Sequence, residues 1–141
     1  MKIRLNIHKQ LKQELIIDKL KKVLFMSMLK MHELAVKYCP VNVGLLRNSI
    51  NFYPQQTGFT SYELAAGKEY ASHVEFGTKP HYVSGKMLES WSQRKLGNKG
   101  AGWAVAKKIA KVGTEAQPFM RPALDQVKTI WVGNFFEHEF K

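Results

Sequence analysis

The stretch "YASHVEFGTKPH", residues 70–81, contains the clearest signals for the end of a helix in the chain. "YASHVEF" predicts a short helix, because Gly77 then stands just after its last turn and a proline follows soon afterwards. The same stretch holds His73, Glu75 and His81, residue types that occur in metal sites and in acid–base pairs. Whether these side chains do chemistry or fix a shape decides what kind of protein this is.

The spacing of these three residues argues against a metal site. His73 and Glu75 are two positions apart, so on a helix their side chains point roughly 200° apart and cannot share an ion. His81 lies beyond the proline-containing turn, and no H-E-x-x-H or comparable ligand motif is present. We therefore expect no metal and no cofactor.

Motifs for covalent and phosphate chemistry are also missing. Cys39 stands between Tyr38 and Pro40 without a neighbouring catalytic motif, and no G-x-S-x-G occurs. "GNKGAG", residues 97–102, is rich in glycine, but no strand is predicted before it and no GK[ST] follows, which favours a flexible turn. The sequence therefore predicts a protein without catalytic activity.

The first forty residues predict a short strand and a long helix. Residues 2–7, "KIRLNI", alternate apolar and polar side chains, which is typical of a half-buried strand. A helical pattern follows over about residues 8–38, and Pro40 ends it because the residue before a proline resists the α conformation. Its apolar positions recur at steps of three to five: Leu11, Leu15, Leu20, Leu24, Met28, Met31, Leu34, Ala35 and Tyr38.

A β-hairpin is predicted between the long helix and the opening stretch. "SINFY" (49–53) and "TSYELAAG" (60–67) flank "PQQTGF" (54–59), and this pattern favours two antiparallel strands joined by a loop. Tyr62 and Leu64 would lie on one face of the second strand. The glycine before the hairpin, Gly44, fits a turn or a bulge.

Beyond the opening stretch, residues 82–112 form a basic, glycine-rich insertion. A short helix is possible at about 86–96 and a weaker one at 103–111, but the composition favours a mobile surface loop or lid. A final helix is predicted over about 121–139, where Pro122 fits the first turn.

Composition restricts the class of protein. A chain of 141 residues with 45% hydrophobic and 23% charged side chains predicts one folded domain, 1–141. A single cysteine can form neither an intrachain disulfide nor a cysteine-based zinc site, which suits a reducing cytoplasm. The N-terminus lacks the apolar core of a signal peptide, and no apolar run is long enough for a membrane span.

The net charge of +11 is concentrated in two blocks. Residues 1–38 carry nine Lys or Arg against three acids, and residues 79–111 carry eight against Glu89 alone. Such blocks favour an acidic partner, either a nucleic acid or an acidic protein surface, although lysines at helical spacing are often simply solvated. Residues in the second block are candidates for contact with a partner or with DNA: Lys86, Arg94, Lys95, Lys99, Lys107, Lys108 and Lys111.

Three separated phrases resemble a known family. "CPVNVGLLRNSI" (39–50), "YASHVEFGT" (70–78) and "QPFMRPALD" (117–125) are similar, in order and spacing, to tailed-bacteriophage neck and tail-completion proteins, which join heads to tails. The resemblance covers nearly the whole chain apart from the insertion. The residues that carry it are Pro40, Gly44, Leu46, Arg47, Ser49, Tyr70, Ala71, Glu75, Phe76, Gly77, Thr78, Pro118, Phe119, Arg121, Pro122 and Ala123.

The resemblance implies an α+β fold, with a small antiparallel sheet packed against a long N-terminal helix and a C-terminal helix. It also implies a structural virion protein without catalytic activity, assembled as a ring of six or twelve copies between head–tail connector proteins and the tail terminator or tube. Such a protein would be found in the virion neck and, during assembly, in the host cytoplasm. The alternative function is a small basic α+β protein that binds nucleic acid.

The charged residues of the three phrases suggest one specific contact. We expect Glu75 to be partly buried and to pair with Arg47 or Arg121, because a buried carboxylate needs a compensating partner. On this interpretation "EFGT" ends a short helix, holds a turn and helps to place a subunit surface.

Overall fold

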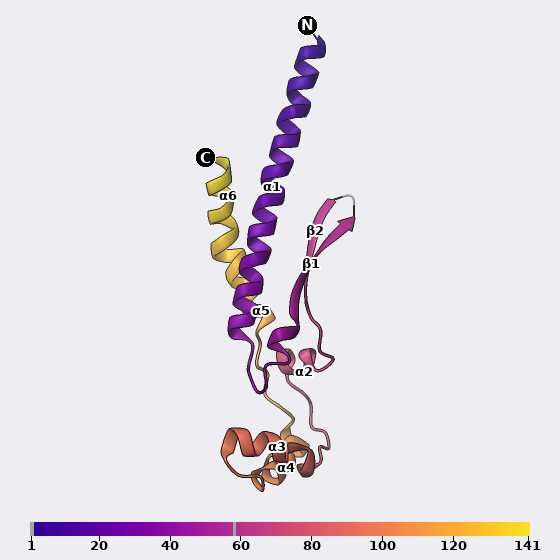
Figure 1. Cartoon of the computed structure of the whole chain (residues 1–141), viewed down its shortest axis with the longest axis vertical. Helices are drawn as coiled ribbons and strands as arrows, with labels where there is room; N and C mark the ends of the chain where they lie inside the picture. Colours follow the sequence, from indigo (N-terminus) through magenta and orange to yellow (C-terminus); the bar gives the residue numbers. More distant parts are fainter. Residues whose placement is uncertain (1, 58) are drawn as a thin grey trace.

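The computed structural model describes the backbone of residues 2–57 and 59–141, and the side chains of residues 13–52 and 62–141. The molecule is elongated, with one long helix running through most of its length (Figure 1). The elements in chain order are α1 (Lys2–Tyr38), η1 (Arg47–Ser49), β1 (Ile50–Thr57), β2 (Phe59–Ala66), α2 (Ala71–Phe76), α3 (Gly85–Leu96), α4 (Ala101–Val112), α5 (Met120–Gln126), η2 (Val127–Trp131) and α6 (Val132–Phe140). The fold is α+β, as predicted.

The expected strand at residues 2–7 is wrong, because α1 begins at Lys2. Among the described residues, the sheet has two strands, β1 and β2, and they pair with each other. A lone strand would leave its N–H and C=O groups without partners, whereas a helix satisfies them internally. The predicted end at Tyr38 is confirmed, with Pro40 close behind.

The hairpin β1–β2 lies along one side of α1 (Figure 1). Its strands are antiparallel, with Phe52 opposite Leu64. They extend to Thr57 and Phe59, so the connection is shorter than the predicted 54–59 loop, and Gly58 lies outside the described residues. The predicted common face is confirmed, because the Tyr62 ring lies 5.8 Å from the Phe25 ring of α1 while Leu64 packs on the core.

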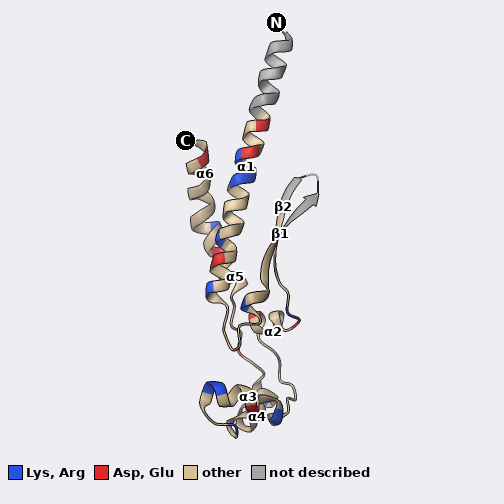
Figure 2. Ribbon diagram, in the orientation of Figure 1, with Lys and Arg blue, Asp and Glu red and all other residues tan. Residues whose placement is uncertain are grey.

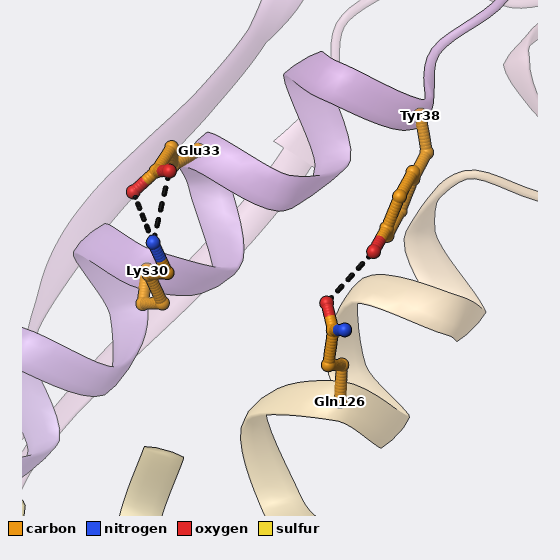
Figure 3. A network of polar contacts seen from close by, with 4 residues as sticks. All are labelled: Lys30, Glu33, Tyr38 and Gln126. Carbon is orange, nitrogen blue, oxygen red and sulfur yellow. Dashed lines mark hydrogen bonds and ion pairs between the residues drawn. The ribbon is translucent and has the colours of Figure 1, made fainter. Parts of the chain in front are cut away.

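The C-terminal helices cover the other side of α1. Residues 120–140 run as one helical segment, close to the predicted 121–139, with a π-helical turn at η2. The hydroxyl of Tyr38 donates to the side-chain carbonyl of Gln126 at 2.7 Å, and Figure 3 shows the two side chains reaching across between the helices. In the same region Lys30 Nζ bonds to Glu33 and lies 4.5 Å from the centre of the Trp131 ring.

The core forms where these layers meet. It is a cluster of buried side chains drawn from α1, the start of the hairpin and the last helical segment: Leu34, Ala35, Cys39, Leu46, Ile50, Phe119, Ala123 and Val127. In Figure 1 this cluster lies towards the lower half of α1, and the hairpin and α6 flank the helix above it.

The basic insertion is not the mobile loop or lid that its composition favoured. It is a hairpin of two helices, α3 and α4, which lie close to the possible helices at about 86–96 and 103–111. The helices cross closely, since a Cβ placed on Gly102 would lie 2.9 Å from the Gly85 carbonyl oxygen. Ser92, which is fully buried, donates to the Lys99 carbonyl at 3.0 Å and so ties α3 to the connection. The glycines interpreted as signs of mobility instead permit this close helix packing.

Two chain segments connect the α3–α4 hairpin to the rest of the molecule (Figure 1). They pair at one point, where Thr78 and Thr114 form an antiparallel bridge and their hydroxyls lie 2.9 Å apart. Within the described residues, no helix combines the length and apolar character needed to cross a membrane.

Candidate functional site

The three family-like phrases converge on one region of the fold. Leu46 and Ile50 from the first phrase, and Phe119 and Ala123 from the third, belong to the same buried cluster. Ala71 of the second phrase packs against that cluster. Residues that are far apart in the sequence therefore build a single junction, which we call the Glu75 junction after its central charged group.

Glu75 is buried, with 7% of its surface exposed, and its carboxylate accepts three backbone hydrogen bonds. Oε2 accepts from the N–H groups of Phe119 at 2.7 Å and Met120 at 2.9 Å, and Oε1 accepts from Arg121 N–H at 2.8 Å. These N–H groups stand at the start of α5, where a helix has donors without partners inside the helix. The positive end of the helix dipole also favours a carboxylate there.

The predicted pairing of Glu75 with Arg47 or Arg121 is therefore wrong. The Arg121 side chain is exposed and its guanidinium carbon lies 6.0 Å from the centre of the Phe76 ring. The buried Arg47 Nε has no hydrogen-bond partner among the described residues. Backbone N–H groups satisfy the carboxylate instead, which a pattern of charged side chains does not reveal.

The turn after α2 brings the second and third phrases together. Gly77 ends the helix with φ of 72°, in the left-handed region, and a Cβ there would lie 2.9 Å from the Ala116 nitrogen. One turn earlier, the Val74 carbonyl accepts from Gln117 N–H at 2.8 Å. The prediction that "EFGT" ends a short helix and holds a turn is confirmed.

The remaining residues of the three phrases lie in loops and near helix ends next to this junction. Gly44 has φ of 82° in the loop after α1, and Ser49 Oγ donates to the Leu46 carbonyl at 2.7 Å. Pro40, Tyr70, Thr78, Pro118 and Pro122 are exposed or half-buried and stand at or next to the ends of helices or in the connecting segments.

His73 and His81 line a cleft of about 950 Å³ between the loop after α1, α2 and α3. Glu75 instead lines a separate hollow of about 440 Å³ beside α5, so the structure does not bring these three residues together. In the part of the chain that the structure describes, no group of three or more His, Cys, Asp or Glu side chains is placed to hold a metal.

The candidate basic residues all lie on the α3–α4 hairpin, where Figure 2 shows Lys and Arg on both helices. Two of them face the body: Lys95 Nζ donates to the Val41 carbonyl at 2.7 Å and Arg94 to the Asn42 side chain at 3.3 Å. Lys108 lies 3.5 Å from Glu115 in an exposed pair. The others are Lys86, Lys99, Lys107 and Lys111, all exposed.

Sequence reasoning missed two features of this region. His32 Nε2 lies 2.9 Å from the carbonyl oxygen of Ile50, linking α1 to the first strand, and no local pattern marks that contact. Cys39 is 2% exposed, and burial raises the pKa of its thiol, an effect that the Arg47 charge partly offsets. The apolar spacing of the first helix could have placed Cys39 in the core.

Comparison with known proteins gave one match. A family model described as "Bacteriophage HK97-gp10, putative tail-component" matches residues 2–77, which is more than half of the chain. The match includes α1, the β-hairpin and α2, and thus the first phrase and all of the second except Thr78, whereas the third phrase and the insertion lie outside it. No curated protein and no solved structure matched the chain.

Proposed function

Because the chain belongs to the HK97-gp10-like family, described as a putative bacteriophage tail component, we propose that it is a structural virion protein of a tailed phage or prophage. In this proposal it forms part of the neck, or head–tail connector, and acts in tail completion and head–tail joining. The family match over residues 2–77 is the observation that carries the proposal.

In this proposal the chain is one subunit of a ring of six or twelve copies. Its neighbours are the connector proteins and the tail terminator or tube. It would occupy the virion neck and pass through the host cytoplasm during assembly. The fold supports a role in shape, since the residues of the Glu75 junction hold backbone segments together by hydrogen bonds and close packing.

The proposal includes no catalytic activity. The candidate acid, Glu75, is committed to three backbone donors. The candidate nucleophile, Cys39, is buried with a raised pKa, whereas reactive thiols are usually accessible and have a lowered pKa. These side chains have structural uses, which supports an interpretation based on assembly.

Particles made without this chain test the proposal. Deleting its gene from the phage or prophage that encodes it should yield filled heads and separate tails, seen by negative-stain electron microscopy. Supplying the full chain from a plasmid should restore joined particles. If the deletion leaves joined, infectious particles at the normal yield, the proposed function is wrong.

Contact with packaged DNA is a second candidate role, and the charge of the α3–α4 hairpin favours it. Residues 85–112 contain seven Lys or Arg and a single acid, Glu89. Lys107 and Lys111 are one helical turn apart on α4, and both are exposed. A surface of this kind would bind phosphates without reading sequence.

Salt dependence tests the DNA contact. Replacing Lys107, Lys108 and Lys111 by alanine should weaken binding of the full chain to duplex DNA. The negative slope of log K against log salt should become shallower by about 0.9 for each DNA phosphate that the variant no longer neutralises. A matched variant removes the same charge elsewhere, at Lys37, Lys68 and Lys79. If both variants lose affinity equally, or if binding does not respond to salt, the α3–α4 hairpin is not the surface that contacts DNA.

A further inference from the structure

Helix α4 has two sides with different surroundings. Gly102 and Ala106 are buried on the side that faces α3, and Val105 and Ile109 beside them are half-buried. Lys111 is nine residues beyond Gly102, which makes two and a half turns at about 3.6 residues per turn, so its side chain points away from α3. The apolar side of α4 is therefore used within the hairpin, and its outer side is a separate surface.

The outer side of α4 combines an aromatic ring with positive charge. Trp103, Lys107 and Lys111 follow one another at steps of four residues, and all three are exposed. Side chains four residues apart on a helix are neighbours, about 6 Å apart along its axis. These three residues therefore form one continuous strip, which we call the Trp103 face.

The Trp103 ring is held on one side and open on the other. A Cβ on Gly85 would lie 2.8 Å from Cγ and 2.6 Å from Cε3 of the indole, and closer still to Cδ2 between them. Because Cδ2 is nearer than the two ring atoms bonded to it, the backbone of α3 lies over the flat side of the ring and not beside its edge. Trp103 is nevertheless 54% exposed, and no other aromatic ring lies against it among the described residues. One side of a fixed indole is thus available to a ligand.

The charge of the Trp103 face is not balanced by the chain itself. Glu89 is the single acid of the α3–α4 hairpin, and it is half-buried on the side of α3 that packs against α4. Glu115, shortly after the hairpin, forms an exposed pair with Lys108 at 3.5 Å. Neither Lys107 nor Lys111 has an ion pair in the part of the chain that the structure describes. The face therefore complements a negatively charged partner.

Three classes of negatively charged partner differ in what they can use of this surface. A membrane surface takes up the apolar side of a basic helix, but that side of α4 packs against α3. An acidic protein can pair with the lysines, but its carboxylates have no use for a flat ring. A nucleic acid offers phosphates to the lysines and flat bases to the indole, and base stacking on aromatic side chains is a common way of holding a single strand. In a duplex the bases are stacked on each other, so only its phosphates would be bound.

We propose that the Trp103 face binds single-stranded nucleic acid, with a base stacked on the open side of the indole and adjacent phosphates beside Lys107 and Lys111. The inference rests on the proposed contact of the α3–α4 hairpin with DNA, and adds that unpaired nucleotides gain a contact that a duplex cannot make. Stacking is available to every base, so the site would bind without selecting a sequence. Figure 1 shows the hairpin at the end of the molecule opposite the N-terminus, where an extended strand can pass across it.

Fluorescence anisotropy of two labelled strands with the full chain tests the stacking contact. One strand is a thymidine oligonucleotide of about 20 residues, longer than the roughly 4–16 nucleotides that single-strand sites usually cover, and the other is an abasic strand with the same number of phosphates. The unmodified chain should bind the thymidine strand about 5- to 150-fold more tightly, the ratio that corresponds to stacking of one base. This comparison needs no substitution and does not depend on how any variant folds.

Substitutions assign the contact to its residues. Trp103→Leu should lose affinity for the thymidine strand by about 5- to 150-fold and leave affinity for the abasic strand nearly unchanged. Trp103→Tyr keeps a ring and should restore most of that loss. Lys107→Ala with Lys111→Ala should weaken binding of both strands, because these side chains meet phosphates. Phe76→Leu is the matched control, since Phe76 is 67% exposed beside the Arg121 guanidinium, outside the hairpin, and its substitution should change neither affinity.

Other outcomes overturn the inference. Equal affinity of the unmodified chain for the two strands would mean that phosphates alone are bound. A Trp103→Leu variant with unchanged helical content by circular dichroism and unchanged affinity for the thymidine strand would mean that the ring makes no contact. Polyglutamate that displaces the thymidine strand as well as unlabelled strand does, at equal charge, would identify an acidic protein surface as the partner.

The proposed functions fail by other measurements. If the two strands bind equally but duplex binding still depends on salt and on Lys107, Lys108 and Lys111, the DNA contact stands and only the stacking is wrong. If the chain discriminates between the two strands but is dispensable for joining heads to tails, the structural role is wrong and the inference stands.

Discussion

Glu75→Ala should lower the free energy of unfolding by about 3–4 kcal/mol, since it removes three hydrogen bonds made by a charged acceptor. The donors are backbone N–H groups at the start of α5, and Phe119 N–H is buried, so its loss of a partner is costly. Urea denaturation followed by circular dichroism measures the change as a shift of midpoint at constant slope.

Two further variants make the result specific. Glu69→Ala, which removes an exposed carboxylate shortly before α2, should change stability by less than about 0.5 kcal/mol. Glu75→Gln keeps the shape but offers one acceptor oxygen in place of two, so it should fall between the alanine variant and the unmodified chain. If Glu75→Ala and Glu69→Ala prove equally stable, the carboxylate does not hold the start of α5.

Phe119→Ala should destabilise the chain by about 3–5 kcal/mol, the range for removing a buried aromatic ring and leaving a cavity. Phe119 is 1% exposed and packs within the cluster that joins α1, the start of the hairpin and α5. Collapse around the cavity is restricted because neighbouring backbone is held by Glu75. The same denaturation experiment measures the loss.

Phe76→Ala provides the matched control, because the same ring is removed from a position that is 67% exposed. It should cost less than about 1 kcal/mol, including its contact with the Arg121 guanidinium. Equal losses for the two variants would mean that Phe119 does not stand at the centre of the core. A smaller loss for Phe119→Leu would confirm that buried volume sets the effect.

Some predictions from the sequence were right because the signals were local. Pro40 fixes the end of α1 at Tyr38, and Gly77 ends α2, since each residue acts on backbone angles within a few positions. The final helix and the two strands also followed from short-range periodicity. Family membership was recognised in the same way, from phrases whose residues have strong local preferences.

Other predictions were wrong where a local pattern fitted two structures. The alternation in residues 2–7 suits a strand, yet the segment is part of α1. The glycines of the insertion suggested a mobile loop, but Gly85 and Gly102 lie where two helices cross. In both cases a pattern of neighbouring residues was compatible with more than one backbone conformation, and the sequence did not show which one the folded chain adopts.

By itself, the sequence determined the ends of most helices, the hairpin, the basic charge of the insertion and the family. These depend on residues close together in the chain. Only the tertiary structure decided that Glu75 meets the backbone of Phe119, 44 residues away, and that apolar residues of α1 between Leu15 and Leu29 remain partly exposed. Both follow from where separate segments come to lie in space, because hydrogen-bond partners and solvent exposure are properties of the packed chain.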